Sequence, residues 1–232
     1  LHNFSNELDL AFNNIITRIC VPIFFIITGY FVAKKEKENK NYISIDDRFA
    51  IEALLTSLRS KDPNCQVGAV LVSKDNRILS TGYNGTPNGI SDKDFPWQKE
   101  GSFLDTKYAY VVHAEKNAIF GFTGDRTLLK GSKLYTTLFP CNECMKTIIQ
   151  VGITEIIYLD NHNFHKDIYE ASRRLVAIHN QDSRYPKITL RPYQISLEAQ
   201  MLMTRSLFKN RTLIALEPEE ETLKRCLVKD KN

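Results

Sequence analysis

Apolar positions from residue 45 to residue 192 follow two periods, one helical and one of strands. Runs with helical spacing alternate with short runs rich in β-branched residues, and turn-forming residues separate them. The first predicted helix begins at Asp46-Asp47, ends before Pro63 and has the apolar positions Phe49, Ala50, Ala53, Leu54 and Leu58. A predicted hairpin follows, with strands Val67–Val72 and Ile78–Gly82 joined by Lys74-Asp75-Asn76. The remaining predicted elements are, in order, helix His113–Gly121, strand Lys133–Leu138, helix Cys141–Val151, strand Glu155–Leu159, helix Ile168–Ile178 and strand Ile188–Pro192. This alternation predicts an α/β protein, a three-layer α/β/α sandwich on a mixed sheet.

A long segment rich in turn formers separates the hairpin from the second helix. It contains Asn84-Gly85, Pro87-Asn88-Gly89, Pro96 and the single tryptophan, Trp97. So many turn formers around one large aromatic side chain predict an ordered functional loop. Asn84-Gly85 is also the preferred pair of a type I′ turn, so a backbone role for Asn84 stays open.

The termini differ from this pattern. Residues 19–33 form an apolar run that would span about 22 Å as a helix, against a membrane core of about 30 Å. The run resembles a transmembrane segment of the integral membrane acyltransferase-3 family. Because the run is short and contains Pro22 and Gly29, a membrane segment, a buried or interfacial helix and a truncated foreign piece all stay open. The start at Leu1 favours the foreign piece. We expect a terminal segment and linker over 1–41, a domain over 42–195 and a helical or charged tail over 196–232.

Composition narrows the classes of partner. The 232 residues are 43% apolar and carry a net charge of +4, with Lys and Arg scattered along the chain. No basic stripe of the kind that follows a nucleic-acid backbone is present, so we expect no nucleic-acid partner. The five cysteines do not form the even set of a disulfide framework, which favours the reducing cytoplasm.

One motif carries the candidate chemistry. His113-Ala114-Glu115 is followed, 28 residues after the histidine, by Cys141, and Pro140-Cys141-Asn142-Glu143-Cys144 completes the pattern. One imidazole and two thiolates suit a tetrahedral zinc ion with one open position. The pattern is the H-x-E…P-C-x-x-C signature of nucleobase deaminases, in which the glutamate carries protons and does not bind the metal. A closed structural zinc site would need a fourth Cys or His, and none lies between the two halves of the motif.

Five motifs in order give the chain a family likeness. It resembles the deoxycytidylate deaminases of the zinc-dependent cytidine and deoxycytidylate deaminase family, most closely those of eukaryotes. The likeness covers roughly residues 45–195 and is carried by Arg59–Ala69, Gly82–Gly89, Leu104–Tyr108, His113–Ala118 and Leu138–Cys144.

The resemblance implies hydrolysis of dCMP to dUMP and ammonia by a zinc-activated water, which supplies dUMP for thymidylate synthesis. It also implies a homo-oligomer, typically a hexamer, with dCTP and dTTP as effectors. The implied roles are catalysis for Glu115; zinc binding for His113, Cys141 and Cys144; substrate binding for Lys61, Asn64, Asn84, Ala114 and Pro140; and an effector loop that includes Gly82, Tyr83 and Gly85.

Two other hypotheses stay open. Another deaminase of the same fold would act on dCTP, cytidine, or a base in tRNA or single-stranded DNA. A catalytically silent nucleotide-sensing module would keep the fold without turnover, although Glu115 beside three intact ligands speaks against it. We do not expect the N-terminal segment to contact a membrane.

Overall fold

The computed structural model describes residues 42–209. The chain divides into two compact units, one formed by Ile45–Ile195 and the other by the two terminal segments. The first unit contains α3 (Ile45–Ser57), β1 (Gly68–Val72), β2 (Ile78–Tyr83), the 3₁₀ helices η3 (Phe103–Asp105) and η4 (Lys107–Ala109), α4 (Ala114–Phe120), η5 (Arg126–Leu129), β3 (Lys133–Leu138), α5 (Asn142–Val151), β4 (Glu155–Asp160), α6 (Asp167–His179) and β5 (Thr189–Pro192). The described part of the second unit holds α7 (Leu197–Lys209).

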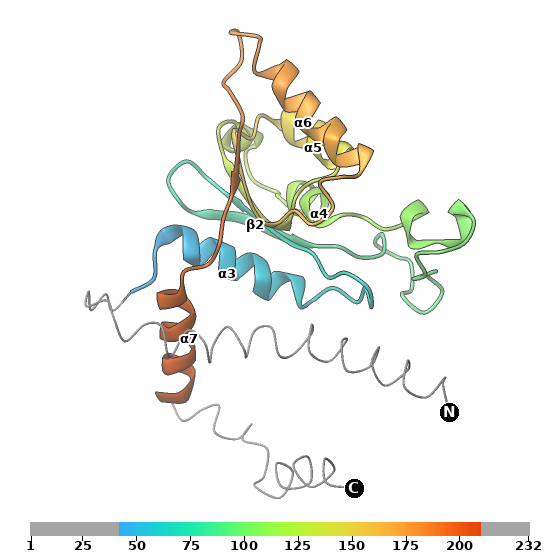
Figure 1. Ribbon diagram of the computed structural model, residues 1–232, viewed down its shortest axis with the longest axis horizontal. Helices are drawn as coiled ribbons and strands as arrows, with labels where there is room; N and C mark the ends of the chain where they lie inside the picture. The colour runs from blue at the N-terminus through green and yellow to red at the C-terminus, as the bar shows by residue number, and fades with distance from the viewer. Residues whose placement is uncertain (1–41, 210–232) are drawn as a thin grey trace, which may run out of the picture. The chain divides into compact units, whose positions relative to one another are not determined.

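The five strands form one mixed sheet in the order β2-β1-β3-β4-β5. β1 pairs antiparallel with both β2 and β3, whereas β3–β4 and β4–β5 are parallel. α3 packs on one face of the sheet, and α4, α5 and α6 lie on the other (Figure 1). The predicted three-layer α/β sandwich on a mixed sheet is therefore confirmed.

Alternation along the strands divides the buried side chains between two cores. Ala69 and Leu71 of β1 join the core beneath α4, α5 and α6. Val70 and Val72 join the smaller core against Phe49 of α3. All five residues of β1 are buried, because the strand has neighbours on both sides and helices on both faces.

Asp46 ties the first turn of α3 to the far strands of the sheet. Its carboxylate accepts bonds from Arg191 Nη1 and Nη2, both at 3.1 Å, and from the Tyr135 hydroxyl. Arg191 Nε also donates to Glu155 Oε1 at 3.0 Å. Burial disfavours the Asp46 carboxylate, but the hydrogen bonds from Arg191 and Tyr135 outweigh that cost and hold its pKa below the ordinary value.

Most predicted elements agree with the observed ones to within a few residues, and α3 shows the clearest difference. The helix ends at Ser57, six positions before Pro63, so Leu58 lies beyond it and is 68% exposed. Leu54 is exposed as well. The other predicted apolar positions, Phe49, Ala50 and Ala53, are buried, and Phe49 and Ala53 pack in the core beneath the sheet.

Some expectations concern residues that the structure does not describe. The apolar run at 19–33 and the charged run at 217–225 both lie outside 42–209. Among the described helices, none combines the length and the apolar character needed to cross a membrane. The division at residues 41 and 195 stays a prediction.

Asp46→Asn is expected to lower the free energy of unfolding by about 1–3 kcal/mol at pH 7, because it removes a charge-assisted bond to Arg191. A depressed pKa stabilises the fold above the ordinary carboxyl pKa, and this contribution is lost as pH falls through the lower folded value. The difference from wild type should therefore shrink as pH falls from about 5 toward 3. Urea denaturation at both ends of that range checks it. Asp75→Asn, at an exposed turn position, is the matched control; a constant difference across the range would contradict the assignment.

Candidate metal centre and active site

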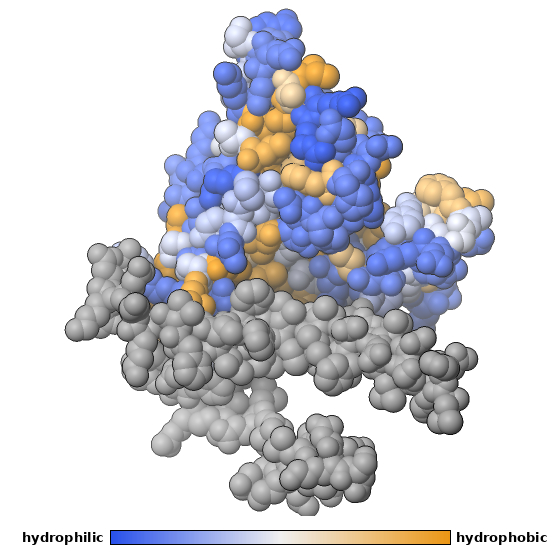
Figure 2. Space-filling model, in the orientation of Figure 1, coloured by the Kyte–Doolittle hydropathy of each residue, from blue (hydrophilic) through white to orange (hydrophobic). Residues whose placement is uncertain are grey.

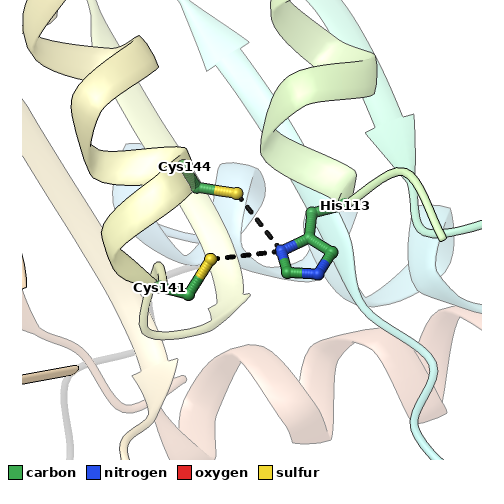
Figure 3. Close-up of side chains that lie close together, drawn as sticks. All are labelled: His113, Cys141 and Cys144. Carbon is green, nitrogen blue, oxygen red and sulfur yellow. Dashed lines mark hydrogen bonds between the residues drawn. The ribbon is translucent and has the colours of Figure 1, made fainter. Parts of the chain in front are cut away.

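The two halves of the motif lie at the starts of two helices. His113 is the N-cap residue of α4, and Cys141 is the N-cap residue of α5, three residues after β3 ends. Cys144 follows in the first turn of α5, so both thiols face the same side (Figure 3). α4 and α5 contact one another on one face of the sheet. This packing brings His113 and Cys141 together, although 28 positions separate them in the sequence.

The three candidate ligand atoms converge. His113 Nδ1 lies 3.3 Å from Cys141 Sγ and 3.3 Å from Cys144 Sγ (Figure 3). All three ligand atoms lie within 4.8 Å of one another. Tetrahedral zinc with ordinary Zn–N and Zn–S bonds would place such nitrogen and sulfur atoms about 3.5 Å apart. Both the donor set and its spacing therefore fit zinc.

The ionisation of the two thiols also favours a bound zinc ion. The hydrogen bond from Cys144 and the nearby His113 lower the pKa of Cys141 to about 4, while the bond to Cys141 and burial raise the pKa of Cys144. The hydrogen bond to Cys141 also raises the pKa of His113. Without a cation, one thiol of this pair keeps its proton. A divalent cation would let both act as thiolate ligands.

Glu115 lies next to the ligands without joining them. Its side chain is only 4% exposed, and Oε2 lies 3.5 Å from Cys144 Sγ. Burial raises the pKa of this carboxyl above its ordinary value. A carboxyl group in this position can exchange protons with a molecule held at the open side of the ligand set.

Close packing holds the two helix starts in place. Gly82 of β2 lies directly beneath α4, where an added Cβ would come within 2.2 Å of the Ala118 nitrogen. On the other side, the Pro140 carbonyl accepts a bond of 2.9 Å from Ser172 Oγ of α6. Phe139 is buried against Phe164, with ring centroids 4.6 Å apart. Gly82 and Pro140 thus have packing roles in the structure, whatever contacts they make with a ligand.

The other residues that we expected to bind the substrate differ in how far they are exposed. Ala114 is buried as the first residue of α4, next to the ligands. Lys61 is 67% exposed on its side chain and pairs with Asp92, so an incoming phosphate would compete with that carboxylate. Asn64 Nδ2 donates to the Trp97 carbonyl at 2.8 Å, which joins its loop to the segment around the tryptophan. Their substrate roles stay predictions.

Asn84 is neither in a type I′ turn nor free toward solvent. No positive φ occurs at Asn84 or Gly85, so the turn alternative is wrong. The buried side chain donates through Nδ2 to Asp62 Oδ2 at 3.1 Å and to the Cys65 carbonyl at 2.9 Å. Its Oδ1 accepts from Val67 N at 2.7 Å. Both amide hydrogens are used within the protein, so Asn84 can offer a ligand only the remaining acceptor position on Oδ1.

The expected effector loop begins at the end of β2. The Tyr83 side chain is partly exposed, and its carbonyl accepts from Asn117 Nδ2 of α4 at 2.7 Å. Gly85 exchanges two backbone bonds with Val112, of 3.1 and 2.9 Å. Val112 directly precedes His113, so this loop is coupled to the metal-ligand segment. Its role as an effector loop stays a prediction.

Two buried charged residues escaped the sequence reasoning. Asp62 is 2% exposed and Lys107 is 5% exposed, and they form an ion pair. Asp62 precedes Pro63 and resembles an ordinary turn residue, and Lys107 falls outside every predicted helix and strand. No local pattern links them, because they are 45 positions apart.

Comparison with known proteins places the chain in a class. The family described as "Cytidine and deoxycytidylate deaminase zinc-binding region" matches residues 43–160. The chain belongs to this family of zinc-binding deaminases, which are hydrolases.

Particular relatives are named more narrowly. A "Probable deoxycytidylate deaminase" of Drosophila melanogaster is 49% identical over 145 residues, 60% of this chain and 70% of the relative. The "Deoxycytidylate deaminase" of Homo sapiens is 46% identical over 140 residues, 60% of this chain and 78% of the relative. A crystal structure of dCMP deaminase from the cyanophage S-TIM5, in complex with dCMP and dUMP, is 25% identical with a TM-score of 0.48 and covers 64% of this chain and 96% of that one.

Cys144→Ala is expected to lose bound zinc and to lower the thermal midpoint of unfolding, because metal affinity and folding are coupled at a site of three protein ligands. Elemental analysis of the purified protein and a thermal melt check both effects. Cys65→Ala, at a free cysteine outside the ligand set, should keep zinc and is the control. Full zinc content in Cys144→Ala would remove Cys144 from the ligand set.

Proposed function

We propose that this chain is a deoxycytidylate deaminase, which hydrolyses dCMP to dUMP and ammonia. The observation that carries the proposal is the convergence of His113, Cys141 and Cys144 beside the buried carboxyl of Glu115. Membership of the zinc-binding deaminase family limits the chemistry to hydrolytic deamination. Relatives of 46–49% identity, named deoxycytidylate deaminases, support the monophosphate as substrate. The product would be the uracil nucleotide used for thymidylate synthesis.

Glu115 is the proposed catalytic residue. When bound, the zinc ion supplies the Lewis acid that makes a water nucleophilic near neutral pH. The raised pKa of Glu115 suits a group that must both accept and release protons. In the proposed sequence, its carboxylate takes the proton of the attacking water and delivers it to N3 of the cytosine. The water oxygen forms a bond to C4, and its second proton passes through the same carboxyl to the amine. The C4–N bond then breaks, and the amine departs as ammonia.

His113, Cys141 and Cys144 would hold the zinc ion and leave its fourth position toward the substrate. The backbone around Ala114, the first residue of α4, and the Phe139 and Pro140 carbonyls, which accept hydrogen bonds, would orient the exocyclic amine. Lys61 and Asn64 would lie toward the 5′-phosphate and Asn84 toward the deoxyribose, through its remaining acceptor position. These substrate contacts belong to the proposal.

The proposal extends to regulation and assembly. dCTP would activate and dTTP would inhibit through the loop that begins at Gly82-Tyr83 and continues past Gly85, since this loop is bonded to Val112 next to the metal ligand. A homo-oligomer, typically a hexamer, would cover exposed apolar side chains such as Phe103 and Leu104. The 3₁₀ helices η3 and η4 belong to the projecting lobe that is green in Figure 1, and this lobe shows an apolar area in Figure 2. The free state of Cys65, Cys141 and Cys144 agrees with a reducing cytoplasm.

Glu115→Gln is expected to keep bound zinc and the wild-type thermal midpoint while kcat falls about 10²–10⁴-fold, because the amide cannot carry the proton. Glu143→Gln, at an exposed glutamate between the two cysteine ligands, is the matched control and should keep kcat. Elemental analysis and steady-state kinetics measure the two quantities. Loss of zinc from Glu115→Gln would assign Glu115 to the metal rather than to proton transfer.

Ammonia release from dCMP, dCTP, deoxycytidine and CMP, measured in parallel, tests the substrate. Turnover of dCMP, raised by added dCTP, is the expected result. Equal or faster turnover of dCTP or deoxycytidine would reject the monophosphate assignment and keep the deaminase chemistry. No turnover of any of the four by zinc-loaded protein would contradict the proposed function.

A further inference from the structure

We propose that Asp62, Lys107 and Asn84 form a buried positioning network, which holds the segment that carries His113 and Glu115 in its working geometry. This inference rests on the proposed function for its kinetic readout. It assigns Asp62 and Lys107 a role through the protein rather than through contact with the substrate, and it gives Asn84 such a role beside its proposed contact with the deoxyribose. None of the three lies among the candidate metal ligands.

The Asp62 carboxylate is fully bonded within the protein. Oδ1 accepts from the backbone nitrogens of Asn64 at 2.8 Å and Cys65 at 3.1 Å. Oδ2 accepts from Asn84 Nδ2 at 3.1 Å and from the Lys107 ammonium. Four donors therefore occupy the roughly four lone-pair positions of one carboxylate. All four hydrogen bonds can form in only one geometry, so the carboxylate can hold the segments around it in fixed positions.

Three separate parts of the chain meet at this carboxylate. Asp62 lies in the loop after α3, Asn84 directly follows β2, and Lys107 begins η4. A further bond of 2.7 Å joins Ser60 Oγ to the Asn84 carbonyl. The network thus fixes the end of β2 and the start of η4 relative to the loop between α3 and β1.

From Lys107 and Asn84 two short backbone routes lead to the metal ligands. The Lys107 carbonyl accepts from Val111 N at 2.9 Å. Gly85, next to Asn84, exchanges two backbone bonds with Val112. Val112 adjoins His113, and Glu115 follows in the first turn of α4. A shift of Lys107 would therefore reach His113 through Val111 and Val112, and a shift of Asn84 would reach it through Gly85 and Val112.

Stability alone does not account for the pair. Replacing a buried ion pair by neutral groups of similar volume is often neutral or stabilising, whereas removing one partner leaves a buried charge and is costly. A role in positioning predicts that a well-packed neutral replacement keeps the fold and loses catalytic geometry. A misplacement of about 1 Å at a catalytic centre can cost about 100-fold in rate.

The double variant Asp62→Asn/Lys107→Met separates the two roles, because it removes both charges and keeps an acceptor at position 62 and an unbranched side chain at position 107. We expect a folded protein with a thermal midpoint lowered by several degrees, because the new amide nitrogen at position 62 would face the Asn84 Nδ2 donor. We also expect full zinc content, an unchanged KM for dCMP, and a kcat lowered about 10- to 100-fold. Arg184→Met, which removes an exposed ion pair with Asp182, should leave both kinetic constants unchanged.

A second readout does not need turnover. With Co²⁺ in place of zinc, the visible absorption reports ligand geometry in the absence of substrate. The double variant should shift these bands, and Arg184→Met should not. If the double variant does not fold, Asn84→Ala replaces it, because this variant leaves the ion pair of Asp62 and Lys107 intact. If Asn84 only contacts the substrate, Asn84→Ala would raise KM and leave the cobalt spectrum unchanged.

The kinetic constants and the cobalt spectrum of the double variant decide whether the network positions the site. A folded, zinc-loaded variant with lowered kcat at constant KM supports the network, and one with wild-type kcat overturns it. If wild-type protein fails to deaminate dCMP, the proposed function fails separately, and the cobalt spectrum decides: shifted bands support positioning, and unchanged bands overturn it.

Discussion

Two helices that begin side by side on one face of the sheet are the constraint on which this protein depends. α4 and α5 contact one another there, and their N-cap residues are His113 and Cys141. An imidazole and two thiols brought within 4.8 Å leave little freedom for other chemistry. A divalent cation relieves the charge conflict between the two thiols and the neighbouring Glu115, and it binds to the arrangement that the packing has already made.

The packing around the helix starts explains why they stay together. Gly82 allows α4 to approach β2 to a distance that no larger residue would permit. Ser172 of α6 holds the Pro140 carbonyl, next to the first cysteine ligand. The sheet, the helices and the loop between β2 and α4 thus all help to hold the three candidate ligands in place. Rigid elements position the ligands more closely than a loop could do alone.

The segment between β2 and α4 is held by a different kind of interaction. A buried carboxylate with four donors joins three parts of the chain that local sequence does not connect. Such a network is costly to break and tolerant of neutral replacement, so its value lies in specifying one arrangement. The same segment also carries exposed apolar side chains at Phe103 and Leu104.

Local sequence determined the elements and the chemistry of the centre, and tertiary structure decided the rest. Helical spacing, β-branched runs and turn formers depend on neighbours within a few positions, so the helices and strands and the three-layer order could be predicted. The ligand types and the spacing of Cys141 and Cys144 within one turn are likewise local. Phe49, Ala50 and Ala53 were predicted from helical spacing and are buried, but the end of α3 was not predicted, and Leu58 lies past it. The use of Asn84 and the pairing of Asp62 with Lys107 depend on side chains that meet only after the chain has folded. A hydrogen-bond partner 22 or 45 positions away leaves no periodic trace in the sequence, because no backbone repeat connects the two.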